Sequence, residues 1–512
     1  MRSSRVEGDI TTPPTPQDPA ERFGARVVRG SLGIAGASYF TVVVGFLANL
    51  LMTRLLAPEA FGVVALATFF FSLLHVRTKV DVLRGYVQWP GSDGAGLGTA
   101  AALELAGALL TVLLTLLLAL LLPLLGYPSD VAVVAVALAG IGVVESAGGI
   151  PGALLDKRLQ FGRGSLMTAI ALPLSYLPAF AAALLGAGYW SLVIQLGTQA
   201  GIYCLGMWWL ARGPVGDAWR DGWRLSAPLA RRLLSFGATW GLGSLAATLI
   251  GQLDNFLIGT AVSLEELGYY DRAYRIALWP SVLVSGIISR TAYVAYARLH
   301  ADPARLARAA NLTLWFMLRA IFLIGTVLLA AAPSVVELLY GPRWAPAALF
   351  LRVLIAMSLL RPMTEELATL LGAVGRPRRA ALAAWTGALT LLGAGLPLTL
   401  LGGAVGTAVA VGVAYLVAAT LASRLVLPLV PIAFGEVAVP AAAAFLAGGA
   451  AGLAVSATVA SAAGEVFLPL RFALEAGLAA AAFIGVLLLL ERRRLVARAR
   501  DAVRLARSGT AS

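Results

Sequence analysis

Apolar runs of about 20 residues follow one another along this chain from about residue 30 to residue 490. We count about 14 such runs, which need roughly 280 residues at 20 residues per membrane span. The rest of the chain leaves only short loops and two tails, with no room for a folded domain outside a membrane. The sequence therefore predicts an all-α integral membrane protein with about 14 transmembrane helices.

The composition excludes several other classes of protein. Charged residues make up 13% of the chain, about half the roughly 25% that a soluble domain carries. A soluble enzyme, a disordered scaffold and a nucleic-acid binder are therefore excluded. Cys204 is the only cysteine, and His75 and His300 are the only histidines. We expect no disulfide, no metal site with histidine ligands and no cofactor.

The positive charges predict how the chain is oriented in the membrane. The net charge is +13, and most Lys and Arg residues flank apolar runs. With the N-terminus inside, about 30 of them fall on the cytoplasmic side and about five outside, as the positive-inside rule requires. This bias predicts a multi-pass protein of the cell (inner or plasma) membrane with both termini in the cytoplasm. Residues 1–26 are predicted to form a disordered cytoplasmic tail, and residues 491–512 a basic one.

A weak internal repeat is visible in the sequence. Glu59-Ala60-Phe61-Gly62 is matched by Glu265-Glu266-Leu267-Gly268, which follows it by 206 residues. Each stretch comes directly after the first span of a possible half of the chain. The match predicts two six-span halves of the same orientation, with a substrate site between them.

The predicted division of the chain follows from this repeat. We expect two pseudo-symmetric six-helix lobes, with two extra helices that lie outside the repeat. A basic segment with two tryptophans is predicted to be an interfacial cytoplasmic linker. The predicted parts are a first lobe at 27–212, the linker at 213–233, a second lobe at 234–428 and the extra helices at 429–490.

Several motifs in both halves resemble one known family. They are Arg54 to Ala67, Leu159, Phe161 and Gly186-x-Gly188-x-Trp190-x-Leu192-Val193 in the first half, and Gln252 to Gly259, Leu267 to Arg275, Gly341-x-x-Trp344, Arg352, Leu360-Arg361-Pro362 and Gly372-x-x-Gly375-Arg376-Pro377 in the second. Taken together they resemble the Wzx-type polysaccharide flippases of the multidrug/oligosaccharidyl-lipid/polysaccharide (MOP) exporter superfamily.

The resemblance implies a function. It implies that the protein flips an undecaprenyl-pyrophosphate-linked oligosaccharide from the cytoplasmic to the outer leaflet, for O-antigen, capsule or exopolysaccharide synthesis. Two six-helix lobes would rock to open a central cavity to each side in turn. The implied partners are the polyprenyl-diphosphate-linked glycan, the lipid bilayer and a polysaccharide polymerase, with no nucleic acid.

Two alternatives stay open from the sequence, and a third, a peptidoglycan-precursor (lipid II) flippase with 14 spans and a cationic cavity, fits the signature residues less well. A drug or cation antiporter of the same superfamily would have about 12 spans and fewer arginines within them. A membrane enzyme, either a polysaccharide polymerase or a glycosyltransferase, would usually have a long outer loop with catalytic carboxylates. The short loops here favour a transporter, so we predict that the protein is not an enzyme.

Arginines within the spans are the candidate ligands for the diphosphate. Each costs about 2.5–3.5 kcal/mol at the centre of a membrane helix unless it is solvated or paired, and a guanidinium can bind phosphate oxygens in bidentate fashion. Arg272 and Arg290 are 18 residues apart, which is five turns of a regular helix and predicts a shared face. Two alternatives are that Arg275 pairs with Asp271 and that a terminal arginine snorkels to the interface. The predicted cavity residues are Arg290, Arg352, Arg272, Arg275 and Arg54.

Acidic residues within the spans are candidates for coupling transport to protons, sodium or the membrane potential. Asp254 lies in the predicted seventh span and Glu365 in the tenth. The alternatives are that Asp254 pairs with an arginine of another helix and that Glu365 pairs with Arg361 at i,i+4. Arg319 is expected to snorkel to the cytoplasmic interface.

Overall fold

Helices form almost the whole of the described chain. The computed structural model describes residues 40–78, 82–91, 93–462 and 467–508, and these residues contain no strand. The first described helix is Phe40–Leu55. The others are α2 Pro58–Thr78, α3 Val82–Gln88, α4 Asp93–Leu121, η1 Pro123–Leu125, α5 Ser129–Lys157, α6 Phe161–Leu184, α7 Trp190–Leu210, α8 Arg212–Arg220, α9 Ala227–Ala261, α10 Leu264–Ala277, η2 Ser281–Ser285, α11 Gly286–Leu299, α12 Pro303–Ala330, α13 Ala332–Tyr340, η3 Pro342–Trp344, α14 Ala347–Ser358, α15 Arg361–Ala373, α16 Pro377–Val426, α17 Phe434–Val437, α18 Val439–Ala462 and α19 Leu468–Ser508.

The predicted all-α membrane fold is confirmed at this level. Nine helical stretches in the described ranges are long and apolar enough to cross a membrane. One of them, α16, turns back on itself at Gly403, whose φ of 57° lies in the left-handed region. The hydroxyls of Thr399 and Thr407 meet at 2.7 Å across this turn, whereas eight residues of straight helix would hold them roughly 12 Å apart. The two arms of α16 are therefore antiparallel, and the full count of 14 spans stays a prediction.

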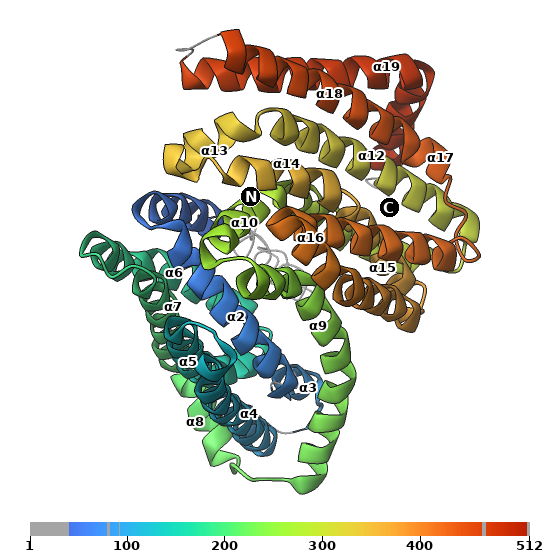
Figure 1. Ribbon diagram of the computed structural model, residues 1–512. Helices are drawn as coiled ribbons and strands as arrows, with labels where there is room; N and C mark the ends of the chain where they lie inside the picture. Colours follow the sequence, from blue (N-terminus) through green and yellow to red (C-terminus); the bar gives the residue numbers. More distant parts are fainter. Residues whose placement is uncertain (1–39, 79–81, 92, 463–466, 509–512) are drawn as a thin grey trace, which may run out of the picture.

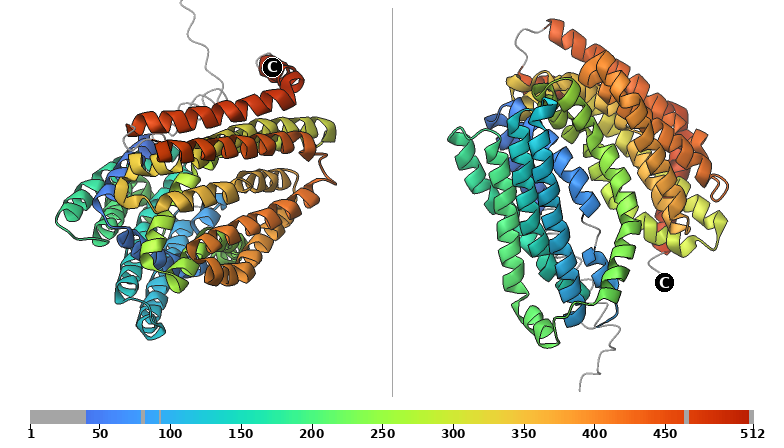
Figure 2. Two further views of the ribbon diagram at one scale, coloured as in Figure 1. Left: turned by 45° about the horizontal axis from the view of Figure 1, so that its top comes forward. Right: turned by 60° about the horizontal axis from the view of Figure 1, so that its bottom comes forward.

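The helices pack in groups that follow the order of the chain (Figures 1 and 2). Helix α5 contacts α4, α6 and α7, and α6 packs on α7. In the later part of the chain α16 packs with α9, α14 and α15, and α14 packs on α10. The last pair, α18 and α19, lies side by side along one edge of the molecule and packs on α12. The predicted linker is largely helical, since it contains α8 and the start of α9.

Helices α2 and α10 cross at two glycines that are equivalent in the predicted repeat. A Cβ atom at Gly62 of α2 would collide with the carbonyl of Leu264, and a Cβ at Gly268 of α10 would collide with the carbonyl of Pro58. Leu264 follows Pro58 by 206 residues, and Gly268 follows Gly62 by the same 206. The two contacts are therefore reciprocal, as two copies related by a two-fold axis would make them. This reciprocity supports the two six-helix lobes, which stay a prediction.

More bonds join the two parts of the chain at the same end of the molecule, which we call the Arg54 end. Arg54 donates from Nε to the carbonyl of Leu339 at 2.8 Å, and Trp344 donates from Nε1 to the carbonyl of Thr53 at 3.0 Å. The hydroxyls of Tyr127 and Thr260 also lie 2.9 Å apart, within hydrogen-bond distance. The charge bias predicts that this end faces outside.

A buried ion pair joins the last helix, α19, to α12. Arg319 of α12 is 6% exposed and forms an ion pair with Glu491 of α19, which is 2% exposed. Arg319 also donates to the carbonyls of Trp315 and Val437, each at 2.9 Å. The expectation that Arg319 snorkels to the interface is therefore wrong, because a buried carboxylate and two carbonyls satisfy its guanidinium inside the protein.

Candidate functional site

A polar cavity lies between the two parts of the chain, directly beside the crossing of α2 and α10. Its volume is about 290 Å³. Phe61 precedes Gly62 at the crossing, and Arg272 lies one turn after Gly268, so the crossing closes the cavity towards the Arg54 end. We call it the central cavity. It is lined by Asn49, Phe61, Val64, Ala65, Thr68, Leu172, Tyr176, Leu192, Gln195, Leu196, Gln199, Gln252, Asn255, Asp271, Arg272 and Arg275.

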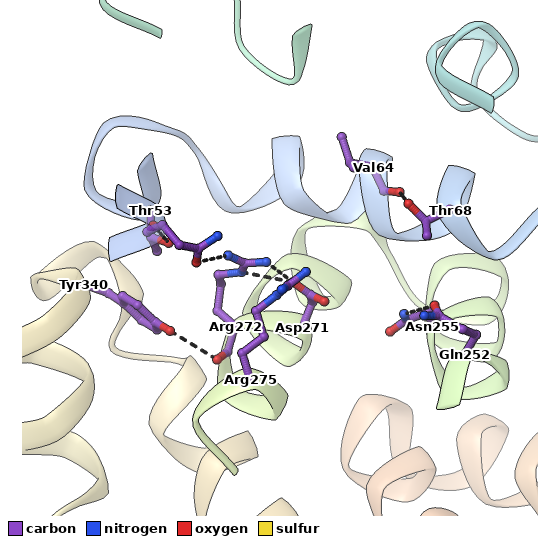
Figure 3. Close-up of polar contacts among 10 residues, drawn as sticks. Thr53, Val64, Thr68, Gln252, Asn255, Asp271, Arg272, Arg275 and Tyr340 are labelled. Carbon is purple, nitrogen blue, oxygen red and sulfur yellow. Dashed lines mark hydrogen bonds and ion pairs between the residues drawn. The ribbon is translucent and has the colours of Figure 1, made fainter. Parts of the chain in front are cut away.

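Arg272 is fixed in place at the edge of this cavity (Figure 3). It is 2% exposed, forms an ion pair with the adjacent Asp271 and donates to the side-chain carbonyl of Asn49 at 2.8 Å. Its guanidinium also lies over the ring of Phe61, 4.1 Å from the ring centre. These contacts place a buried positive charge on the cavity wall and leave it little freedom to move.

Arg275 has more freedom than Arg272. Its Nε lies 3.2 Å from the same carboxylate of Asp271, the i,i+4 pairing that the sequence left open. Its side chain is nevertheless 55% exposed. Two guanidiniums share one carboxylate, so this part of the wall carries a net charge of +1. Arg275 is therefore the more exposed of the two guanidiniums on this wall.

Amide side chains form the remaining polar surface of the cavity. Gln195 donates to Gln199 at 2.9 Å and to Ser175 at 3.0 Å, and Asn255 donates to Gln252 at 3.0 Å. Amides both donate and accept hydrogen bonds, so they suit sugar hydroxyls. The sequence analysis did not single these residues out as ligands. The available signal was the presence of several uncharged amides within otherwise apolar spans.

A second cavity, which we call the side cavity, adjoins the central one. Its volume is about 350 Å³, and Val42, Phe46, Leu278, Trp279 and Val282 make most of its wall apolar. It shares three lining residues with the central cavity, which are Asn49, Tyr176 and Arg275. Arg275 therefore lies where a polar space meets an apolar one.

Of the other three arginines predicted for the cavity, two do not line it, and the side chain of the third is not described. Arg54 binds backbone carbonyls at its own end of the molecule, and Arg352 donates to Ser456 of α18 at 3.0 Å, away from the residues that line the central cavity. The side chain of Arg290 lies outside the described residues. A π-helical turn, η2, separates α10 from α11. Because this turn holds more residues than a regular one, 18 residues no longer equal five whole turns between Arg272 and Arg290.

The two predicted coupling acids lie near a group of tyrosines. Asp254 is 1% exposed and accepts from the hydroxyl of Tyr270 at 2.9 Å. The ring of Tyr270 stacks on Tyr274, whose hydroxyl accepts from Arg361 at 2.9 Å.

Arg361 in turn donates to Glu365 at 2.8 Å, the i,i+4 pair that the sequence left open. Arg361 and Glu365 line a cavity of about 190 Å³ between α9, α15 and α16. No ion pair joins Asp254 to an arginine within the described ranges. Over the same ranges, no group of three or more His, Cys, Asp or Glu residues could hold a metal ion.

The arrangement of helices resembles that of solved membrane transporters. The fold matches the lipid II flippase MurJ in an inward closed conformation with a TM-score of 0.64 and 13% identity, over 90% of this chain and 98% of the other. It also matches an inward-facing multidrug resistance MATE family transporter with a TM-score of 0.61 and 16% identity, over 75% of this chain and 95% of the other. At these identities the likeness shows the fold alone.

Sequence comparison identifies the family within that class. Residues 51–349 match the family described as "Polysaccharide biosynthesis protein", and the chain belongs to this family. The succinoglycan biosynthesis transport protein ExoT of Rhizobium meliloti is 26% identical over 324 residues, which span 62% of each chain. The lipopolysaccharide biosynthesis protein WzxC of Escherichia coli is 21% identical over 360 residues, 69% of this chain and 70% of the other. The resemblance to the polysaccharide flippases is therefore confirmed.

Proposed function

We propose that this protein carries a polyprenyl-diphosphate-linked oligosaccharide across the cell membrane, from the cytoplasmic to the outer leaflet. The observation that carries the proposal is the position of Arg275 between the amide-lined central cavity and the apolar side cavity. Such a cargo has three chemically different parts, which are a glycan, a diphosphate and a hydrocarbon chain. The amides suit the glycan, Arg275 suits the diphosphate, and the side cavity suits the start of the hydrocarbon chain.

The charge of the central cavity favours an anionic cargo. A phosphate about 4 Å from a guanidinium gains about 4 kcal/mol at an effective dielectric constant of 20. Arg272 is largely occupied by Asp271 and Asn49, so Arg275 would supply most of this attraction. A drug or cation antiporter, the first alternative, would instead need a net negative site for a cationic cargo.

The names of the relatives support a glycan cargo. ExoT is named for transport in succinoglycan biosynthesis and WzxC for lipopolysaccharide biosynthesis. A transport role argues against the second alternative, a polymerase or a glycosyltransferase. A polysaccharide polymerase, which would consume the flipped repeat unit, is the partner that this function implies.

Alternating access is the mechanism we infer. The central cavity is closed at the Arg54 end by reciprocal contacts between α2 and α10. A matched pair of contacts can separate by a rigid rotation of the two lobes, 27–212 against 234–428, because no helix has to unfold. Asp254 and Glu365 are proposed to couple this rotation to protons, sodium or the membrane potential.

The proposed orientation places both termini in the cytoplasm. Reporter fusions after Ser512 and within the loop at Gly126 should give cytoplasmic and external signals, respectively. An external signal from Ser512 would show that the orientation is the opposite of the proposed one, with the closed end of the cavity in the cytoplasm.

The proposal is tested at Arg275. Arg275→Gln should abolish surface polysaccharide in the host while the protein remains in the membrane, because the diphosphate loses its main cation. Arg275→Lys should restore export only in part, since lysine keeps the charge but not the bidentate geometry. Arg298→Gln is the matched control, because Arg298 is an exposed arginine near the end of α11 and away from both cavities. Normal export by Arg275→Gln would refute the role of Arg275 and the proposal that rests on it.

A further inference from the structure

A second cluster of charges, whose carboxylate is fully buried, lies between α14, α18 and α19. Glu475 of α19 has no exposed surface and accepts from Ser334 at 2.6 Å and from Arg471 at 3.1 Å. Arg352 of α14 donates through a terminal nitrogen to Ser456 of α18 at 3.0 Å. None of these five residues lines the central cavity, so the cluster is separate from the proposed transport site.

Among the described residues, the cluster has more positive charge than negative. Glu475 forms an ion pair with Arg471, whereas Arg352 forms no ion pair with a described residue. The Nε of Arg352 is buried and has no hydrogen-bond partner among the described residues. A guanidinium offers five N–H donors, and only one bond of Arg352 is made to a described residue. The described residues of the site therefore carry a net positive charge and a buried N–H donor without a described partner, and both are costly without an anion.

The cluster lies near helix ends on one side of the molecule. Arg471 lies in the first turn of α19, and Arg352 lies five residues into α14, about 7.5 Å along the helix from its start. Ser456 lies in the last two turns of α18. The start of α14 directly follows η3, whose Trp344 donates to Thr53, and α19 packs on α13, whose Leu339 accepts from Arg54. Both helix ends therefore lie towards the Arg54 end. A lipid phosphate in that leaflet could reach the two arginines from the side.

We infer that Arg352, Arg471 and Ser456 bind the phosphate group of a lipid in the leaflet at the Arg54 end. The free N–H groups of the two guanidiniums would donate to the phosphate oxygens, and the Ser456 hydroxyl would add a third donor. The phosphate supplies the negative charge that the cluster lacks. Glu475 keeps its bonds to Arg471 and Ser334 and so holds Arg471 in place.

Two lipids could supply this phosphate. One is a phospholipid of the bilayer, and the other is the polyprenyl-diphosphate carrier after it has been flipped. The second source rests on the proposed function, whereas the first does not. Binding of phospholipid alone would leave this inference standing even if the proposed function failed.

The test is native mass spectrometry of the purified full-length protein in detergent. The probes are phosphatidylglycerol, undecaprenyl diphosphate and inorganic pyrophosphate, added in separate titrations. We expect Arg352→Gln to weaken lipid binding at least tenfold and Arg352→Lys to weaken it less. Arg343→Gln should bind like the wild type, because Arg343 is an exposed arginine in η3 at the same end of the molecule. Binding of pyrophosphate as tightly as either lipid would overturn the lipid assignment.

Two further variants keep the inference falsifiable. Ser456→Ala removes one donor without stranding a charge, so it should fold and weaken lipid binding severalfold even if Arg352→Gln does not fold. Glu465→Gln removes the acid that is nearest to Ser456 in the sequence. Glu465 lies outside the described residues. If Glu465→Gln lowers thermal stability as much as Arg352→Gln while lipid binding stays the same in both, the partner of Arg352 is Glu465 and the inference is wrong.

Discussion

Replacing Gly62 with alanine should open the end of the molecule that α2 and α10 close. The new Cβ would collide with the carbonyl of Leu264, which is backbone and cannot rotate away. Overpacking of this kind costs about 1–3 kcal/mol. In the proposed alternating-access cycle the contact exists only while the cavity is closed at this end, so the whole cost would fall on that state. The equilibrium should then shift towards the opposite state by roughly 5- to 150-fold.

The reciprocal contact makes a second, equal prediction. Gly268→Ala should have an effect of the same size, since its Cβ would collide with the carbonyl of Pro58 in the equivalent way. Alanine also stabilises a helix by about 1 kcal/mol relative to glycine. The control must therefore also be a glycine-to-alanine change within a helix. Gly140→Ala and Gly393→Ala provide it, because both glycines lie within helices and a Cβ at either one meets nothing within 4 Å.

The assay is the labelling rate of one cysteine in the central cavity. In a Cys204→Ser background, Thr68→Cys places a thiol on the cavity wall. A membrane-impermeant maleimide added outside intact cells should label it slowly, and markedly faster after Gly62→Ala or Gly268→Ala. Labelling of both variants at the rate of the Gly140→Ala control would refute the argument. A large effect of one glycine and none of the other would refute the reciprocity.

Two other predictions concern buried carboxylates. Arg319→Met should lower the free energy of unfolding of the detergent-solubilised protein by about 3–5 kcal/mol, because it leaves Glu491 buried and unpaired. In thermal melts, adding Glu491→Met should recover part of this loss. Arg305→Gln, which removes an exposed ion pair, should change the stability little. Asp254→Asn should block export while the protein remains in the membrane, if protonation or cation binding at this buried acid drives the cycle, and export at the normal level would exclude that role.

The sequence predicted contacts within a helix better than contacts between helices. The pairs Arg275–Asp271 and Arg361–Glu365 both occur, because residues four apart meet on any regular helix. Arg319 was misassigned because its partner lies 172 residues further along the chain. Arg352 shows the same difficulty, since spacing along α14 does not reveal which neighbouring helix the residue faces.

The amides of the central cavity escaped prediction for a different reason. Charged residues in a span attract notice because their burial is costly, and the positive-inside rule gives each one a topological meaning. Gln195 and Gln199 cost less and carry no such meaning. Only the packing of α7 against the rest of the molecule shows that both face a common space with Arg275.

The central cavity has two unlike walls. Every charged residue that lines it, Asp271, Arg272 and Arg275, belongs to α10, whereas Gln195 and Gln199 of the opposite wall are neutral. When two rigid bodies turn against each other, a ligand held by charge stays with the body that bears the charge, and its neutral part slides along the other. A diphosphate bound at Arg275 would thus move with the later half of the chain, while the sugars exchange one weak hydrogen bond to the amide wall for another. One transporter could then accept glycans of differing sequence, because it binds tightly only the diphosphate, which every cargo shares.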